Sequence, residues 1–143
     1  MPGSYDPDTN RYYISMNDVC LAKTPETPDH MIGLDVNTMQ ITMDNKAREI
    51  QTSGKLATAG GLLFSAASDR YFRAYDVQDG KVLWQTRVQD VPNGAPITYS
   101  VDGKQYVAIV AGNPGIVGGG LARSTGENVR PDGGVVLWVW QLP

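Results

Sequence analysis

The side chains used most often for metal binding and nucleophilic catalysis are scarce in this chain. Its 143 residues contain one cysteine, Cys20, and one histidine, His30. Zinc centres of the finger and hydrolase types need several such ligands, and these counts exclude them. A Ser-His-Asp triad would have to use His30, and Cys20 cannot form a disulfide within the chain.

A different candidate for metal binding is the pair Asn17 and Asp18, which follows a run rich in β-forming residues at 12–16. Amide and carboxylate oxygens suit a hard cation such as calcium. An Asn-Asp pair after a strand also commonly forms a plain turn. The residues themselves leave both interpretations open.

A third candidate is the glycine-rich segment 112–133, which contains glycines at positions 112, 115, 118, 119, 120, 126 and 133. Loops of this length in compact domains are usually functional or mobile. A phosphate-binding loop would need a helix directly after it, and the sequence predicts none there.

Charge and hydropathy exclude other classes of partner. The chain has 12 basic and 15 acidic residues, a net charge of −3, so it offers no basic surface for nucleic acid or anionic lipid. It has no apolar run long enough to span a membrane, and its N-terminus lacks the pattern of a secretion signal. We therefore expect no nucleic-acid partner, no membrane segment and no signal peptide in this chain.

The elements that must position these candidates are strands. The chain combines 16 Gly and 9 Pro with many short apolar runs, which favours an all-β fold. The pattern predicts strands at 12–16, 31–35, 62–66, 71–76, 81–88, 97–100, 105–110 and 135–140. It predicts an exposed loop at 23–29. The polar segment 44–54 could form a helical turn but is too short for a stable amphipathic helix, so the pattern predicts a connection there.

The chain also repeats itself weakly. Shifting it by 41 residues places the segment 33–43 over 74–84, so that Asp35 meets Asp76 and Met43 meets Trp84. A repeat near this length with period-two apolar patterning is typical of a four-stranded propeller blade. We expect Asp76 to bond the turn after it, Gly80 to adopt a positive φ, and Trp84 to pack between sheets.

The residues Ala74, Asp76, Gly80, Lys81 and Trp84 fill every fixed position of the pattern A-x-D-x-x-x-G-K-x-x-W. This is the tryptophan-docking motif of the pyrroloquinoline quinone (PQQ) dependent alcohol dehydrogenases, which the chain resembles. The order of its segments resembles the C-terminal third of those eight-bladed enzymes. The resemblance implies a single all-β segment, a partial β-propeller of about three to four blades, with blade-like repeats around 12–43, 56–88 and 97–142.

The resemblance also implies a site. It places Asn17 as a ligand of a catalytic calcium or lanthanide ion. It places Gly112, Asn113 and Gly115 near the carboxylates of PQQ, because the family's cofactor lies beside the corresponding loop. Thr52 or Ser53 falls where family members carry a tryptophan beneath the quinone ring, so we expect that aromatic floor to be absent.

By the same resemblance, the chain is part of an enzyme that oxidises a primary alcohol to an aldehyde in the periplasm. The catalytic base of the family lies on segments that would precede residue 1, so we expect the chain to be inactive alone. Its expected partners are the remainder of the propeller or another copy of the chain, and a cytochrome c electron acceptor for the full enzyme. The alternative is a non-catalytic module that binds a partner through exposed blade edges.

Overall fold

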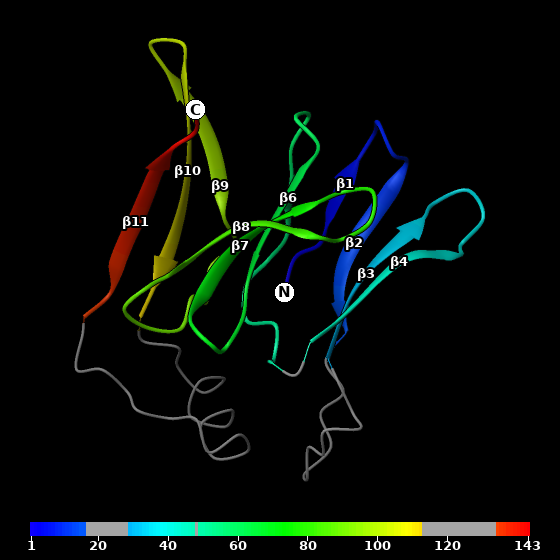
Figure 1. The fold of residues 1–143 in the computed structure, drawn as a ribbon, viewed down its shortest axis with the longest axis horizontal. Helices are drawn as coiled ribbons and strands as arrows, with labels where there is room; N and C mark the ends of the chain where they lie inside the picture. The colour runs from blue at the N-terminus through cyan, green and yellow to red at the C-terminus, as the bar shows by residue number, and fades with distance from the viewer. Residues whose placement is uncertain (17–28, 48, 113–133) are drawn as a thin grey trace, which may run out of the picture.

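The computed structural model describes residues 1–16, 29–47, 49–112 and 134–143. Every regular element in these ranges is a β-strand, and the strands form three antiparallel sheets that lie side by side (Figure 1). The all-β class predicted from the sequence is confirmed. Among the described residues, no helix is long and apolar enough to cross a membrane.

The first sheet has the strand order β1-β2-β3-β4. These strands are β1 (Ser4–Asp6), β2 (Arg11–Met16), β3 (Asp29–Asp35) and β4 (Ile41–Ala47). Because β4 continues to Ala47, the predicted connection over 44–54 is wrong at its start. Asp44 pairs with Ile32 and Asn45 with Met31, and these cross-strand partners outweigh the weak β-propensity of the polar residues.

The second and third sheets follow the same antiparallel plan. The second has the order β5-β6-β7-β8, with β5 (Leu56–Ala57), β6 (Leu62–Ala66), β7 (Tyr71–Asp76) and β8 (Val82–Arg87). The third has the order β11-β10-β9, with β9 (Ile97–Val101), β10 (Lys104–Ala111) and β11 (Val136–Gln141). Asp102 and Gly103 form the β9–β10 turn with φ values of 50° and 75°, as a tight hairpin requires.

The weak repeat seen in the sequence corresponds to a repeated turn. The amide of Met39 donates to the carbonyl oxygen of Asp35 at 2.8 Å, and the amide of Gly80 donates to that of Asp76 at 2.9 Å. Both donors have a positive φ, 57° for Met39 and 75° for Gly80. The strand register also shifts at Gly33/Leu34 and again at Ala74/Tyr75, 41 residues later by the numbering. The predicted alignment therefore matches residues with the same backbone geometry.

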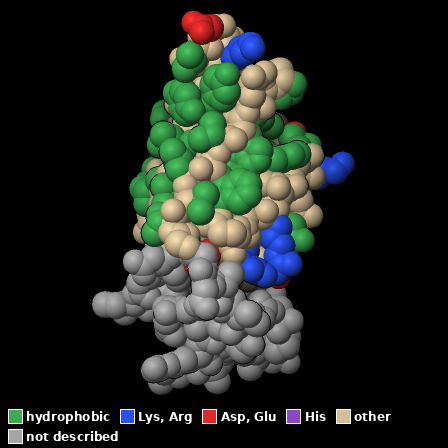
Figure 2. Space-filling view, turned by 90° about the vertical axis from the view of Figure 1, so that its left-hand side faces the viewer, with side chains coloured by type: hydrophobic (Ala, Val, Ile, Leu, Met, Phe, Trp, Pro, Cys, Tyr) green, Lys and Arg blue, Asp and Glu red, His purple; other side chains and the backbone are tan. Residues whose placement is uncertain are grey.

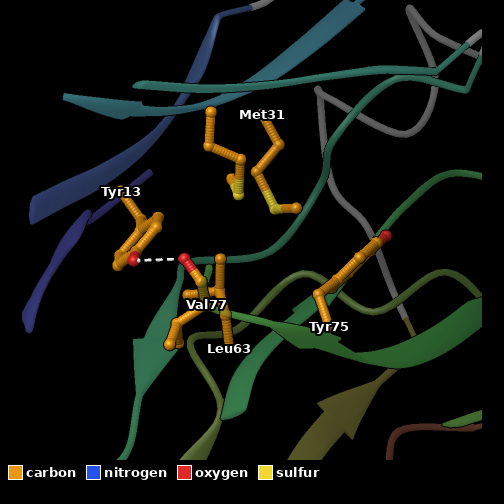
Figure 3. Packing of buried hydrophobic residues seen from close by; sticks show 6 residues of the cluster. Tyr13, Met31, Leu63, Tyr75 and Val77 are labelled. Carbon is orange, nitrogen blue, oxygen red and sulfur yellow. Dashed lines mark hydrogen bonds between the residues drawn. The ribbon is translucent and has the colours of Figure 1, made fainter. Parts of the chain in front are cut away.

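The first core lies between the first and second sheets (Figure 3). Tyr13 and Met31 enter it from the first sheet, while Leu63, Tyr75 and Val77 enter from the second. The hydroxyl of Tyr13 donates to the carbonyl oxygen of Val77 at 2.8 Å, so a directional bond crosses the apolar layer. We call this layer the first junction.

The second core lies between the second and third sheets, and we call it the second junction. It contains Phe64 and Phe72 from the second sheet and Val107 and Ile109 from the third. Trp84 meets Trp140 of β11 edge to face, with ring centroids 5.7 Å apart. This contact confirms that Trp84 packs between two sheets.

The other face of the third sheet carries apolar side chains that are exposed. By the strand register, this outer face contains Ile97, Tyr99, Val101, Tyr106, Leu137 and Val139. Leu137 is 60% exposed and Ile97 is 55% exposed. Figure 2 shows apolar side chains gathered on the side of the molecule that lies at the left of Figure 1, where β10 and β11 run.

Candidate functional site

The leading segments of the three sheets converge at one edge of the stack. The amide of Ala57 donates to the Ser4 hydroxyl at 2.9 Å, which links β5 to β1. A side chain added at Gly54 would meet Ala95 and Pro2, with its Cβ 2.8 Å from the nearest atom of each. The chain near Pro2, the segment 51–55 and the segment 91–95 are therefore in close contact, and we call this region the inner edge.

Thr52 lies on the inner edge and is 5% exposed. Its amide donates to the carbonyl oxygen of Ala66 at 3.2 Å, which fixes the backbone beside β6. Its Oγ1 atom is buried and has no hydrogen-bond partner among the described residues. A buried hydroxyl without a partner is unusual in a folded protein, because the lost hydration is not replaced.

Lys55 is the second unusual group of the inner edge, since it is only 4% exposed. Its amine donates to Gln51 Oε1 at 2.9 Å and forms a very short contact with Ser65 Oγ. Burial lowers the pKa of this amine from 10.5 to about 7, because the low-dielectric surroundings disfavour the charged form. Lys55 is therefore an amine that can exchange a proton near neutral pH.

Gly112 lies at the end of β10 and closes the inner edge on the side of the third sheet. Its amide donates to the Val91 carbonyl oxygen at 3.2 Å, and its own carbonyl oxygen accepts from Asn93 Nδ2 at 3.3 Å. Its φ is +119°, and a Cβ there would lie 2.8 Å from the carbonyl oxygen of Gly134. Only glycine allows this approach between the two described ends of the glycine-rich segment.

Two of the five site residues predicted from the sequence, Thr52 and Gly112, can be placed. Gly112 lies beside the segment 91–95, which it contacts through Val91 and Asn93. Thr52 lies beside β6 and two residues before Gly54, whose Cβ position is 2.8 Å from Ala95. Asn17, Asn113 and Gly115 lie outside the described residues, and their roles stay predictions. In the part of the chain that the structure describes, no cluster of three or more His, Cys, Asp or Glu side chains could hold a metal ion.

One described group of the inner edge, the Thr52 hydroxyl, fits an oxygen acceptor on a polar cofactor. The hydroxyl of Thr52 has a free hydrogen-bonding capacity, and a carboxylate or quinone oxygen could accept from it. Position 52 carries a hydroxyl and no aromatic ring, so this position cannot supply stacking beneath a flat cofactor. The available interaction at Thr52 is therefore a hydrogen bond.

Sequence reasoning missed Lys55, Gln51 and Ser65. The only signal was a lysine inside the otherwise small and apolar run Gly54 to Ala59. A lysine in such a run is normally assigned to the surface, because burying its charge is unfavourable. Here the pairing of β5 with β6 buries the lysine, since continuing their register by one residue places Lys55 opposite Ser65.

Comparison with known proteins gives a consistent picture. The family described as PQQ, the β-propeller domain of glucose, ethanol and alcohol dehydrogenases, matches residues 7–107. The 1-butanol dehydrogenase (quinone) of Thauera butanivorans is 30% identical over 99% of this chain and 26% of its own length. The quinoprotein glucose dehydrogenase of Escherichia coli is 48% identical over 46% of this chain and 8% of its own length.

Among solved structures, a europium-containing methanol dehydrogenase superposes with a TM-score of 0.67 at 28% sequence identity. The superposition covers 78% of this chain and 24% of that enzyme. The chain thus spans about a quarter of the length of the 1-butanol dehydrogenase and methanol dehydrogenase that it matches.

Proposed function

Because the chain belongs to the family of PQQ-dependent glucose, ethanol and alcohol dehydrogenase β-propeller domains, we propose that it forms part of a PQQ-dependent alcohol dehydrogenase. The proposed reaction is oxidation of a primary alcohol to an aldehyde. The observation that carries the proposal is the match of one sequence family over residues 7–107, which the superposition on a methanol dehydrogenase supports.

The proposed role of this chain is to supply one side of the cofactor site. PQQ, when bound, accepts the hydride from the alcohol. Thr52 donates its free hydroxyl to an oxygen of the cofactor, and the backbone at Gly112 holds the start of the glycine-rich segment against the inner edge. The proposal also assigns Asn113 and Gly115 to the carboxylates of PQQ and the amide oxygen of Asn17 to calcium or a lanthanide.

Other parts of the proposed enzyme complete the reaction. The catalytic base lies on the remainder of the propeller, and a cytochrome c accepts the electrons in the periplasm. The chain alone therefore binds PQQ weakly and does not turn over alcohol. Lys55 takes no step in this scheme, since its amine is already held by Gln51 and Ser65.

The test measures PQQ binding to the full 143-residue chain by equilibrium dialysis, with calcium or lanthanum present. Thr52→Val removes the free hydroxyl while keeping the shape of the side chain. We expect it to weaken PQQ binding by about tenfold, the effect of one hydrogen bond to a charged acceptor. Ser68→Ala is the matched control, because Ser68 Oγ is also buried and without a partner among the described residues.

Two results would contradict the proposal. Equal PQQ binding by the chain, by Thr52→Val and by Ser68→Ala would remove Thr52 from the site. Dye-linked oxidation of ethanol or butanol by the chain alone would show that the catalytic base does not lie on another segment.

A further inference from the structure

The segment 91–95 of the inner edge contains the dipeptide Asn93-Gly94, the one place in the sequence where a glycine follows an asparagine. Asparagine is a chemically labile residue, because the backbone nitrogen of the next residue can attack its side-chain carbonyl carbon. The attack closes a small ring, and a Cβ on the next residue hinders it. Glycine has no Cβ, so ring closure meets the least steric resistance at this dipeptide.

The folded chain leaves the reacting groups of this dipeptide accessible. Asn93 is exposed and lies outside the strands, shortly before β9. The backbone amide of Gly94 donates to no acceptor among the described residues, so no hydrogen bond has to break before it reacts. Asn45 differs, because it lies inside β4 and the backbone that follows it is paired with β3.

The structure also shows that glycine is not needed at position 94 for packing or for backbone conformation. A Cβ built on Gly94 would lie 3.8 Å from Val110 Cβ, an ordinary van der Waals contact. Positive φ values of described glycines occur at positions 61, 80, 103 and 112, and Gly94 is not among them. The property that distinguishes glycine here is therefore the unhindered amide nitrogen that it offers to Asn93.

The Asn93 side chain takes part in a contact of the inner edge. Its Nδ2 donates to the carbonyl oxygen of Gly112 at 3.3 Å, and the Gly112 amide donates back to the Val91 carbonyl oxygen at 3.2 Å. At the other end of the same segment, Ala95 packs closely against Gly54, whose Cβ position lies 2.8 Å from it. A chemical change at 93–94 therefore acts on contacts with the chain before β5 and with the chain after β10.

We propose that Asn93 is a site of spontaneous deamidation that changes the contact between the segment 91–95 and Gly112. The Gly94 nitrogen bonds to Asn93 Cγ, the Cγ–Nδ2 bond breaks, and Nδ2 leaves as ammonia with the proton of the Gly94 amide. Water then opens the succinimide ring at Cγ to give aspartate, or at the backbone carbonyl to give isoaspartate. Water is the one co-reactant, and nothing is oxidised or reduced. The inference is independent of PQQ binding.

Both products alter the inner edge. Each replaces the amide donor that faces Gly112 with a carboxylate, which only accepts hydrogen bonds. Two acceptors then face each other across the 3.3 Å contact, so the contact opens. Isoaspartate also adds one carbon atom to the main chain before Gly94, which displaces Ala95 from its close packing against Gly54. The modification therefore loosens the inner edge, and without an enzyme that reverses it the change is permanent.

The test follows the mass of one peptide from the 143-residue chain. Trypsin cuts after Arg87 and Lys104, and the peptide 88–104 between these cuts contains Asn93 as its only asparagine. The folded protein is incubated at mildly alkaline pH and digested at intervals, with a sample at time zero to correct for deamidation during digestion. We expect the peptide to gain about 1 Da, because –NH2 becomes –OH, and to separate into aspartate and isoaspartate forms. Peptides with the other asparagines should gain mass more slowly.

Two variants sharpen the test. Gly94→Ala is the matched control, because its Cβ fits beside β10, and it should slow the mass gain by about tenfold. Asn93→Asp reproduces one product directly. In this variant the Gly112 amide should exchange with solvent about fivefold faster, the effect of one lost hydrogen bond. The amides of Val107 and Ile109, inside β10, should exchange at an unchanged rate.

Three results would overturn the proposal. One is a peptide 88–104 that gains mass when the chain is unfolded in urea but keeps its mass in the folded protein, because the fold would then prevent ring closure. Another is an equal rate of mass gain in Gly94→Ala, which would exclude attack by the amide at position 94. The last is unchanged exchange at Gly112 in Asn93→Asp. Should either variant fail to fold, the comparison of folded and urea-unfolded chain still decides whether the site reacts.

Discussion

The two junctions between sheets are held together by different kinds of interaction. At the first junction, polar bonds cross between the sheets: Arg11 Nη1 donates to the carbonyl oxygens of Val77 and Gln78, both at 2.9 Å. Asn45 Nδ2 donates to the Gly80 carbonyl oxygen, also at 2.9 Å. These directional bonds fix the position of the first sheet relative to the second, because the donors reach their acceptors only within a narrow range of distances and angles.

The second junction depends mainly on aromatic rings. Phe72 stacks on Phe64 with centroids 5.6 Å apart and on Trp140 with centroids 5.2 Å apart. A polar link is present as well, since Gln89 Nε2 donates to the Ala111 carbonyl oxygen at 3.0 Å. Ring contacts tolerate more sliding than hydrogen bonds do, and at this junction Trp84 stays 39% exposed. The first junction is thus specified by polar contacts and the second by apolar area.

The largest expected effect comes from truncating the two residues that share a place in the repeat. Met43→Ala should lower the free energy of unfolding by about 2 to 5 kcal/mol, because it empties part of a closed core. Trp84→Ala should lower it by about 2 to 4 kcal/mol, no more than Met43→Ala despite the larger side chain, because Trp84 is 39% exposed. Urea unfolding followed by far-UV circular dichroism measures both. The reverse order would mean that the second junction is as closed as the first.

The next prediction concerns Lys55, whose buried amine lies on the face of the second sheet that packs against the first sheet. It concerns how the free energy of unfolding changes with pH. Between about pH 7 and 10.5 the unfolded chain binds a proton at Lys55 that the folded chain does not, so stability should rise with pH. The expected slope is about 1.4 kcal/mol per pH unit, checked by urea unfolding from pH 7 to 9.

Lys55→Met is the control for this slope, since it keeps the length of the side chain and removes the amine. The pH dependence of the free energy of unfolding between pH 7 and 9 should become nearly flat in this variant. An unchanged slope would assign the effect to another group and would mean that Lys55 stays charged in the folded protein from pH 7 to 9.

A pair of glycines isolates the contact that covers Met43. Gly80 and Gly103 both have a φ of +75°, so alanine at either position carries the same backbone strain, about 1 to 2 kcal/mol. Only at Gly80 would the new Cβ meet a neighbour, the Met43 sulfur at 3.0 Å. Gly80→Ala should therefore be more destabilising than Gly103→Ala by about 1 kcal/mol. If thermal unfolding shows the same loss of stability for Gly80→Ala and Gly103→Ala, the residues around Met43 can shift to accommodate the new methyl group.

The smallest expected effect concerns the hydroxyl that crosses the first junction. Tyr13→Phe removes the bond to the Val77 carbonyl oxygen and should lower the free energy of unfolding by about 1 kcal/mol, since Arg11 still donates to that oxygen. Tyr12→Phe, on the neighbouring exposed residue, should change it by less than about 0.5 kcal/mol. A loss as large as that of Met43→Ala would mean that the polar bonds, rather than the apolar core, dominate the first junction.

Much of the strand pattern could be predicted because short-range rules govern it. The turn at Asp76 to Gly80 and the hairpin at Asp102 and Gly103 depend on side-chain bonding and positive φ values that neighbouring residues supply. The continuation of β4 to Ala47 could not be predicted, because its polar residues gain their strand character from partners on β3. The burial of Lys55 could not be predicted for the same reason, since Ser65 and Gln51 become its neighbours only when β5 pairs with β6.

The candidate site, too, combines features that the sequence predicts with features that only contacts between distant segments create. The sequence and its resemblance to a known family pointed to Thr52 and Gly112, yet the contact of Thr52 with Ala66 and of Gly112 with Asn93 emerges only from the folded chain. The sequence by itself determined the all-β class, the repeat and the turn geometry, because these follow from local bonding and period-two patterning. Only the tertiary structure decided which equivalent side chain is covered, Met43 or Trp84, since exposure depends on whether another strand stands across from it.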